Sequence, residues 1–503
     1  MNAPYFHAKQ IGTEIKTDGL LVCHNGHKVA SSNGNIDGVF ADWAWDGSRL
    51  VVHNDQYGFY PLYYYTISGE FGISTSIAKL MELGAPPLFD DAGMAVFLRL
   101  GFFIGEDTPF KGIRALPRCH SFCWTTEGLQ IELTKPRIKT TIISRSRAID
   151  AYISLFRQSI QRRLATDYTL LLSGGKDSRH ILFELCAAGH RPELCITSAK
   201  SLAWIDDDIA VAKELTATLN LRHVTLAEPH PCLEGELRTN LVTSFCSDEH
   251  GWFLPVADYL SNKTRTTYDG IGPGDVLSAA YFTNNERLAM FRAGKFTELA
   301  VCLLDKAKES IPEGILAAIL PLEEYRRFNR ELATEHLSDE LKLHAEAPDP
   351  VGAFYLANRT RREIALAPYA LLANIENVYS PYLDHDLYDF LSSLPAEMLI
   401  DHKFHLDTIL RAYPEYSRIP YAENSRLRLK SSKHFRRFAL DLLRYAVRHL
   451  PLQFVRHSFL LPRLARALVD AKYSYEVSWF GQLTTYLIQL QTLTEGDSYQ
   501  SIG

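Results

Sequence analysis

The residues best suited to chemistry in this chain follow a short apolar run. Tyr168–Leu172 is rich in β-forming and apolar residues, and the next six residues are Ser173, Gly174, Gly175, Lys176, Asp177 and Ser178. The amphipathic segment Arg179–Ala188 follows, and Gly189 after it is a typical helix stop. The pattern therefore predicts a strand, a glycine turn and the N-terminus of a helix in direct succession.

A glycine turn between a strand and a helix is a geometry that binds phosphate. Gly174 and Gly175 let the backbone approach an anion, and free N–H groups at the helix start point toward it. Lys176 adds positive charge, and Asp177 offers a hard oxygen ligand for Mg²⁺. Glycines alone also fit an ordinary turn, but the whole Ser-Gly-Gly-Lys-Asp-Ser run favours a nucleotide site.

The spacing differs from a Walker A loop, in which Lys-Ser/Thr follows a longer glycine loop. The run instead resembles the pyrophosphate loop of enzymes that split ATP between its α- and β-phosphates. Those enzymes transfer AMP to a carboxylate or another oxygen, and pyrophosphate departs.

Composition bounds the class of protein. The chain has 503 residues, 46% of them hydrophobic and 22% charged, which is typical of a globular protein of two to four domains. Its net charge of -6 argues against a general nucleic-acid binder. The eight cysteines form no Cys-x-x-Cys pair, so we interpret them as reduced thiols in a cytoplasm. We find no signal peptide and no apolar stretch long enough to span a membrane.

The pattern of residues changes near position 140. Residues 1–140 hold short alternating runs separated by turn residues, which predicts hairpins of a largely antiparallel β layer, with one helix over Ala92–Leu100. Beyond a basic connector, the pattern predicts a helix over Ala148–Leu164 and then strands that alternate with helices. The remaining elements that we expect are strands at Leu194–Thr197 and His223–Leu226 and a helix over Asp206–Leu219. Such alternation predicts a parallel sheet whose ligands lie at the carboxyl ends of the strands.

A second glycine cluster runs from Tyr268 to Asp275 and includes Gly270 and Gly272. Its glycines and proline predict an irregular turn. If this turn lies beside the first glycine loop, Asp177 and Asp275 could share one Mg²⁺ and gather the pyrophosphate oxygens. We also assign Thr197, at the end of the next strand, to cofactor binding.

These motifs and several others, in the same order along the chain, resemble an asparagine-synthetase-type family. Asp207 and Asp208 resemble its acidic pair after the second strand, and Lys403 and Arg411 fall where the family has a Lys and an Arg. The remaining matching segments are Asp269–Tyr281, Pro381–His385, Ser393–Pro395, Gly38–Asp46 and Asp55–Tyr64. The resemblance covers about residues 35 to 430.

The resemblance implies the fold and the domains. We expect an α/β protein with an N-terminal β-rich, glutaminase-like (Ntn-type) layered domain over residues 1–140. A C-terminal α/β parallel-sheet ATP-pyrophosphatase domain with many helices would cover residues 141–503, and ATP and Mg²⁺ would be its cofactors.

Three departures from the family pattern carry functional information. A working glutaminase of the family has a cysteine directly after the initiator Met, whereas this chain has Asn2 there and its first cysteine is Cys23. We therefore expect that the N-terminal domain releases no ammonia from glutamine and is a structural or partner-binding relic.

The second departure lies at Ile271 and Val276, where relatives place residues that help the attacking amine. Glu376 and Glu363 are then alternative catalytic bases. The third departure is a missing Lys after the Leu-Pro helix, whose role near the pyrophosphate could fall to Lys430, to Lys176, or to the arginines Arg426 and Arg428.

The resemblance therefore implies an ATP-dependent, AMP-forming carbon–nitrogen ligase. It would adenylate a small-molecule or peptide carboxylate, which an amine other than glutamine-derived ammonia then attacks. Relatives without the cysteine include β-lactam synthetases and lasso peptide cyclases, so lasso-type macrocyclisation in antibiotic biosynthesis is our leading version.

Two alternatives stay open: a catalytically degenerate homologue that binds nucleotide or a partner, and thiolation of a tRNA base. The segment Phe435–Ala467 is basic and amphipathic. It is either a solvated helical face or a docking surface for an acidic or peptide partner.

Overall fold

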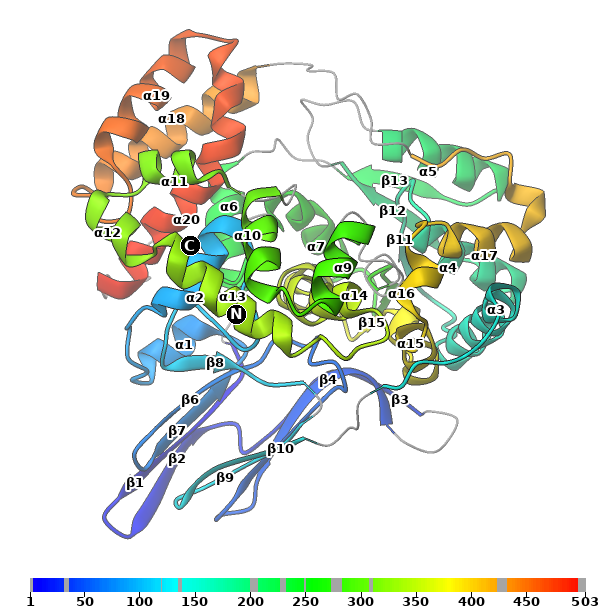
Figure 1. Cartoon of the computed structure of the whole chain (residues 1–503), viewed down its shortest axis with the longest axis horizontal. Coiled ribbons are helices and arrows are strands. Elements are labelled where there is room, and N and C mark those ends of the chain that lie inside the picture. The colour runs from blue at the N-terminus through cyan, green and yellow to red at the C-terminus, as the bar shows by residue number, and fades with distance from the viewer. Residues whose placement is uncertain are drawn as a thin grey trace.

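The computed structural model describes residues 3–30, 36–118, 120–133, 138–199, 207–226, 232–247, 250–272, 283–306, 311–422 and 432–495. Residues 3–133, which are called the N-terminal half below although they are about a quarter of the chain, contain two five-stranded antiparallel sheets. A third, parallel sheet follows in the chain. Figure 1 shows the two antiparallel sheets at the bottom, the parallel sheet at the upper right and the last helices at the upper left. This agrees with the expected mixed α/β fold; the boundary predicted near residue 140 lies between the last N-terminal strand and the next helix.

The first antiparallel sheet has the order β2-β1-β7-β6-β8 and the second β10-β9-β5-β4-β3. The strands of the first sheet are β1 (Tyr5–Ile11), β2 (Glu14–Gly19), β6 (Tyr63–Ile67), β7 (Glu70–Ser74) and β8 (Ile113–Ala115). Those of the second are β3 (Val22–Ala30), β4 (Ile36–Trp45), β5 (Leu50–Asn54), β9 (His120–Thr125) and β10 (Gly128–Leu133).

Aromatic side chains join the two antiparallel sheets. The ring of Phe71 on β7 stacks on Trp124 of β9 with centroids 5.4 Å apart. Because successive side chains of a strand point to opposite faces, β6 serves two cores. Tyr64 packs in the core between the sheets, whereas Tyr63 and Tyr65 pack in the core of the later helices.

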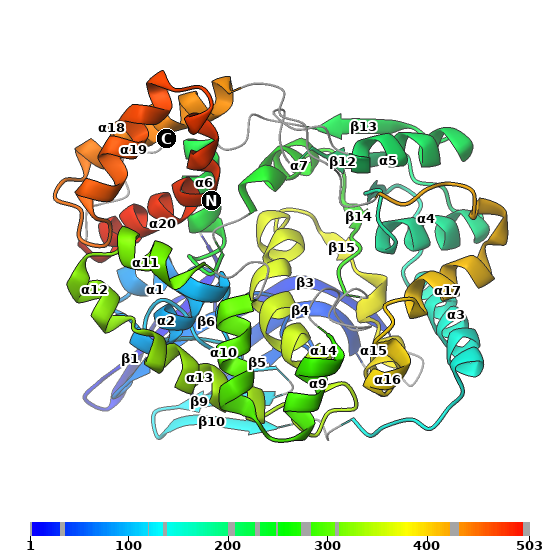
Figure 2. The ribbon, with the colours of Figure 1, turned by 45° about the horizontal axis from the view of Figure 1, so that its top comes forward.

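The parallel sheet has the order β13-β12-β11-β14-β15, and all its pairings are parallel. Its strands are β11 (Thr169–Leu171), β12 (Leu194–Ser198), β13 (His223–Leu226), β14 (Thr266–Tyr268) and β15 (Asn377–Tyr379). The strands and helices predicted from sequence in this region are present, with ends that shift by up to three residues. Figure 2 shows α3, α4 and α5 on one side of this sheet and α7 on the other.

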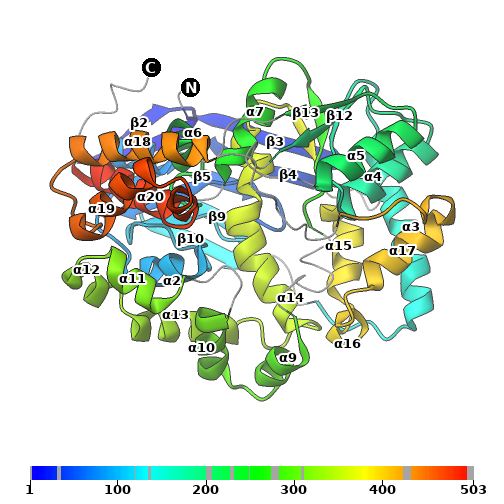
Figure 3. The same ribbon diagram turned by 90° about the horizontal axis from the view of Figure 1, so that it is seen from above.

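The helices of the first two thirds of the chain are α1 (Ile77–Glu82), α2 (Asp91–Leu100), α3 (Arg145–Arg162), α4 (Asp177–Ala187), α5 (Asp207–Thr218), α6 (Leu233–Val242), α7 (Leu254–Leu260), α9 (Asn285–Arg292), α10 (Phe296–Lys306), α11 (Glu313–Ile319), α12 (Leu322–Arg327) and α13 (Arg330–Lys342). The later ones are α14 (Pro350–Tyr355), α15 (His385–Ser392), α16 (Ala396–Leu399), α17 (Phe404–Ala412), α18 (Lys433–Arg448), α19 (His457–Val469) and α20 (Val477–Glu495). Seen from above, α18–α20 and the pair α3 and α17 lie at opposite ends of the molecule (Figure 3). Among the described helices, none is long and apolar enough to cross a membrane.

Two π-helical segments, Leu356–Ile364 and Ala367–Leu371, continue the chain after α14. The first carries buried polar residues that bind the N-terminal half. Arg361 donates hydrogen bonds to the carbonyl oxygens of Leu116 (2.6 Å) and Gly58 (3.3 Å). The two halves of the chain are therefore joined by buried polar contacts as well as by a shared apolar core.

Candidate functional site

The Ser-Gly-Gly loop leaves the carboxyl end of β11, where the order of the parallel sheet reverses. From β11 the chain proceeds to β12 and β13 on one side, and it later returns to β14 and β15 on the other. In open α/β sheets the crevice at such a reversal is where ligands bind. The loops after β11 and β14 both open at this edge, so the two glycine clusters predicted from sequence start side by side.

Hydrogen bonds inside the protein give the first loop its shape. The Ser173 N–H donates to Ser178 Oγ (3.0 Å), and the Gly175 N–H donates to Ser173 Oγ (3.2 Å). The Gly174 N–H donates to Asp208 Oδ1 (2.9 Å) at the start of α5. Short polar side chains thus occupy the amides of both glycines. The first turn of α4 has no side-chain cap, and its backbone amides are the anion donors that the fold offers.

The second loop packs directly on the start of α4. A Cβ atom on Gly270 would lie 3.1 Å from the Ser178 nitrogen and 3.3 Å from Asp177 Cβ, so glycine is what permits this approach. Gly272 has a φ of +124°, a backbone conformation that L side chains rarely adopt. The structure thus brings Asp177, Ser178 and Gly270 into one site, as their sequence pattern predicts. Whether these residues bind a nucleotide stays a prediction.

Each of the two loops that touch carries one described carboxylate, Asp177 on the first and Asp269 on the second. The Asp177 side chain is 39% exposed, and its charge contributes to the raised pKa of Asp269. Removal from water is the larger cause, and together they raise the pKa of Asp269 to about 6 against a hydrogen bond from the Ile271 N–H. Sequence reasoning chose Asp275 as the second metal ligand, and that residue lies outside the described part of the chain. Asp269 is the described carboxylate that accompanies Asp177.

This pair fits a Mg²⁺ ion bound with a nucleotide. Mg²⁺ usually takes one or two carboxylates and completes its shell with phosphate oxygens and water. No group of three or more His, Cys, Asp or Glu side chains arranged for a metal occurs among the described residues.

His405, which sequence reasoning did not select, supports the Asp177 carboxylate. Its Nε2 lies 3.2 Å from Asp177 Oδ1, and its Nδ1 pairs with the Tyr152 hydroxyl at 2.9 Å. Burial raises the pKa of Tyr152 well above its ordinary value, so the phenol keeps its proton and can donate it to Nδ1. His405 Nε2 has no hydrogen-bond partner among the described residues, so its approach to Asp177 is an ion-pair contact. A lone histidine on a helix carries no sequence signal for this role, because α17 reaches α4 only in the folded chain.

The segment Ile419–Ala422 lies over the first loop. The Ala422 N–H donates to the Gly174 carbonyl (3.0 Å), and a Cβ atom on Gly174 would lie 2.7 Å from Ala422 Cβ. Arg179 donates to the Ile419 and Pro420 carbonyls, and its guanidinium lies 3.8 Å from the ring centre of Tyr421. The predicted catalytic Lys430, together with Arg426 and Arg428, lies outside the described residues.

Two further predicted residues have other surroundings. The Thr197 hydroxyl donates to the Leu172 carbonyl (2.7 Å) and pairs with His223 Nε2 (2.8 Å), so it holds the carboxyl edge of the sheet together. Lys176 is the residue before α4, and it has an αR backbone. Its proposed contact with phosphate stays a prediction.

The two predicted amine bases lie on elements other than the two loops. Glu376 is exposed and precedes β15, so it lies at the amino end of the parallel sheet, whereas the loops leave the carboxyl ends. Glu363 is buried in the first π-helix, and its carboxylate pairs with Arg359 at 3.2 Å. Sequence spacing suggested both residues, but strand direction and helix burial decided where they lie.

The N-terminal half holds no activated thiol at its first cysteine. Burial raises the pKa of Cys23, and Asn25 Nδ2 donates to its Sγ (3.4 Å). Whether the N-terminal region releases ammonia from glutamine stays a prediction.

The basic C-terminal surface is a stripe on α18. Its members are exposed, recur on one side of the helix and are Lys433, Arg437, Arg444 and Arg448. Asp441 lies within the stripe and pairs with Arg437 (2.8 Å) and Arg444 (3.6 Å). A peptide or protein partner for this stripe stays a prediction.

The comparison with protein-family models matches one part of the chain. A sequence model of the family described as "Glutamine amidotransferase domain" matches residues 8–135. No curated protein matches the chain.

Solved structures give distant similarities. NMN synthetase from Francisella tularensis is 18% identical, with a TM-score of 0.22, over 41% of this chain and 97% of that one. Glutamine phosphoribosylpyrophosphate amidotransferase from B. subtilis, complexed with ADP and GMP, is 11% identical, with a TM-score of 0.15, over 37% of this chain and 47% of that one. An allosteric regulatory enzyme of purine biosynthesis is 12% identical, with a TM-score of 0.15, over 39% of this chain and 50% of that one.

Proposed function

We propose that this protein is an ATP-dependent, AMP-forming carbon–nitrogen ligase that activates a carboxylate and joins it to an amine. The observation that carries the proposal is the contact between the two glycine loops at the reversal point of the sheet. There, Gly270 packs against the first turn of α4, and two carboxylates accompany uncapped backbone amides. Amides and a metal-binding carboxylate at one edge are what a departing diphosphate requires.

The proposed reaction has two steps. A substrate carboxylate oxygen attacks the α-phosphorus of ATP, the bond from that phosphorus to the bridging oxygen breaks, and pyrophosphate leaves. The amine nitrogen then attacks the acyl carbon, AMP departs with the bonding electrons, and the nitrogen loses a proton. Such chemistry depends on positioning and charge stabilisation more than on covalent participation by the protein.

The residues of the chain would have distinct tasks. Backbone amides at the start of α4 would bind the diphosphate, and Lys176 would balance its charge. Asp177, with Asp269 or Asp275, would hold Mg²⁺, which when bound neutralises phosphate charge. His405 would keep the Asp177 carboxylate in one orientation. Glu363, which pairs with Arg359, and Glu376, which precedes β15, remain the alternative amine bases of this proposal.

The amine in this proposal does not come from glutamine. The half-buried Cys23, whose Sγ accepts a hydrogen bond from Asn25, supports this view, although residues 8–135 match a glutamine amidotransferase domain. An amine supplied by the substrate itself would close a ring. Macrocyclisation of a lasso-type peptide in specialised metabolism is therefore the version that we favour.

ATP–pyrophosphate exchange, measured with a panel of carboxylates and peptides, tests the proposal. We expect exchange that depends on Mg²⁺ and on the carboxylate, and its complete loss in Asp177→Ala. Asp150→Ala is the matched control, because Asp150 is an exposed aspartate on α3 that pairs with Arg411 away from the loops. Exchange that survives in Asp177→Ala would contradict the assigned role. Nucleotide binding without exchange for any substrate would favour the degenerate homologue.

A further inference from the structure

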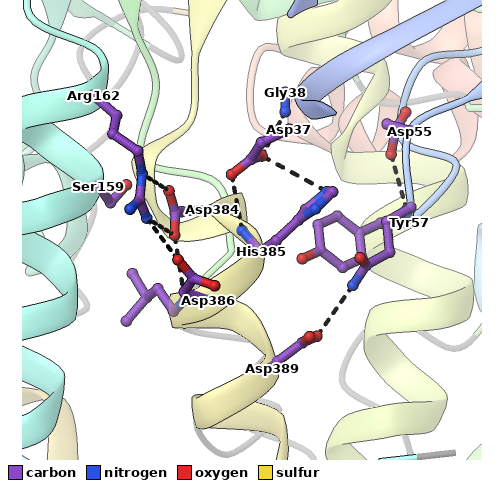
Figure 4. Close-up of polar contacts among 12 residues, drawn as sticks. Asp37, Gly38, Asp55, Tyr57, Ser159, Arg162, Asp384, His385, Asp386 and Asp389 are labelled. Carbon is purple, nitrogen blue, oxygen red and sulfur yellow. Dashed lines mark hydrogen bonds and ion pairs between the residues drawn. The ribbon is translucent and has the colours of Figure 1, made fainter. Parts of the chain in front are cut away.

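A buried arginine connects the N-terminal half to the parallel-sheet half. Arg163, which ends α3, lies between Asp37 of β4 and Asp384 at the start of α15. Its guanidinium nitrogens are 3.1 Å from Asp37 and 2.8 Å from Asp384, and all three side chains are at most 1% exposed. Figure 4 shows Asp37 directed at His385, the first residue of α15, and Asp384, the residue before it, directed at Arg162.

The cluster of Arg163, Asp37 and Asp384, called the junction below, includes further hydrogen bonds to both carboxylates. Asp37 also accepts hydrogen bonds from the N–H groups of Gly38 and His385, the latter at 3.1 Å (Figure 4). Asp384 caps α15 by accepting from the Leu387 N–H. A buried charge that loses its partner is costly, so removal of either carboxylate disturbs the junction as a whole.

The junction holds the turn Pro381–Leu383, which directly precedes Asp384. Arg162 Nε donates to Asp384 at 3.0 Å, and Ser159 Oγ donates to the Pro381 carbonyl at 2.6 Å. The turn is therefore fixed at both ends, by α3 at its start and by the buried charges at its end.

This turn touches both glycine loops. The Tyr382 hydroxyl donates to the Asp177 carbonyl at 2.9 Å. A Cβ atom on Gly272 would lie 3.2 Å from Tyr382 Cβ, which places the second loop against the same residue.

A second contact from the N-terminal half reaches the second loop. The His27 ring on β3 packs edge-on against Tyr379 of β15, with centroids 5.0 Å apart. The Tyr379 carbonyl accepts the Asp269 N–H at 2.9 Å. Each loop is thus linked to the N-terminal sheets through one intervening segment.

We propose that the amidotransferase-like half is a positioning element of the nucleotide site, and that Asp37 holds the two glycine loops through Arg163, Asp384 and Tyr382. The role as a nucleotide site rests on the function proposed above, whereas the mechanical link does not. On this view the N-terminal half is retained without glutaminase chemistry because the loops need its support.

The test compares Asp37→Asn with Asp42→Asn. Both residues lie on β4, but Asp42 pairs with His24 and Lys28 of the neighbouring strand and does not contact Arg163 or Asp384 in any interaction recorded for the described residues. We expect Asp37→Asn to weaken Mg·ATP binding about tenfold, the scale on which residues behind a metal ligand act. It should also speed amide hydrogen exchange in residues 173–178 and 269–272, while α20 exchanges at the wild-type rate. Asp42→Asn should change neither.

Tyr382→Phe is a gentler second variant in case Asp37→Asn does not fold, because it removes only one hydroxyl. It should produce the same two effects. Adding Asp37→Asn to Tyr382→Phe should weaken Mg·ATP binding by a smaller factor than Asp37→Asn does in the wild-type protein, because Tyr382→Phe has already broken the link.

The proposed link would be overturned if the losses of Mg·ATP binding in the two single variants added up in the double variant. It would also be overturned if amide hydrogen exchange in the loops were unchanged in both folded single variants. If the wild-type protein binds no Mg·ATP, the proposed function fails, and the exchange rates of the loops still decide the mechanical link. If Asp177→Ala abolishes Mg·ATP binding but Asp37→Asn and Tyr382→Phe leave binding and exchange unchanged, only this inference fails.

Discussion

Gly174 is the position at which a single methyl group tests the assignment of the site. In Gly174→Ala the new Cβ would lie 2.7 Å from Ala422 Cβ and 3.0 Å from Asp208 Cα. Ala422 cannot rotate its Cβ away, and the second contact is with backbone, so the loop or the segment Ile419–Ala422 must move. Neither partner is the flexible end of a long side chain.

The size of the effect follows from these distances. Carbon atoms in contact prefer a separation of about 3.5–4.0 Å, so the loop must shift by roughly 1 Å. Overpacking of this kind costs about 1–3 kcal/mol of stability. A misplacement of about 1 Å at a site that depends on positioning lowers the rate about 100-fold.

Gly175→Ala is the matched control. Its new Cβ would meet only Ser173 Oγ, at 3.2 Å, and a hydroxyl can adjust. We expect ATP–pyrophosphate exchange to fall about 100-fold in Gly174→Ala. The free energy of unfolding should fall by about 1–3 kcal/mol in Gly174→Ala and by less in Gly175→Ala. Urea unfolding followed by fluorescence gives the stability of both variants. Equal losses in the two variants would refute the argument that Gly174 is required for close packing under Ala422.

Three further predictions follow from individual contacts. His405→Gln should weaken Mg²⁺-dependent nucleotide binding about tenfold, whereas His434→Gln on α18 should not; equal titration curves for the two would contradict the orienting role. Burial, with the charges of Arg163 and His24, lowers the pKa of His27 to about 3, so the folded protein keeps this ring neutral while the unfolded chain protonates it near pH 6.5. The neutral His27 ring therefore contributes its full stability above pH 6.5, and this stability is lost as the pH falls toward 3, by about 3 kcal/mol at pH 4.5. The urea concentration at the unfolding midpoint should consequently fall less between pH 7 and 4.5 in His27→Gln than in the wild type. Cys23→Ala should leave amide formation from a supplied amine unchanged, because this half-buried thiol takes no part in the proposed reaction; a loss of product at unchanged stability would argue for a thiol-dependent step.

Local sequence was sufficient for the strand, turn and helix around Ser173–Ser178. Glycines, a β-rich apolar run and helix periodicity act over a few residues, so their outcome is readable without the rest of the chain. The alternation that follows indicated a parallel sheet, and the order of its strands agrees with loops that meet at one edge. The sequence also suggested Asp177 and the second glycine cluster as neighbours, and Gly270 lies against the start of α4.

Tertiary structure decided what surrounds that loop. Asp208 occupies the Gly174 amide, His405 faces Asp177, and Ala422 covers the turn, although these residues come from three distant segments. The direction of β15 places Glu376 away from the loops, and helix burial pairs Glu363 with Arg359. Contacts between residues far apart in sequence depend on how whole elements pack, and no local pattern encodes them. The buried charges that tie Asp37 to Asp384 through Arg163 are of this kind, and they connect the two halves of the protein beneath its candidate site.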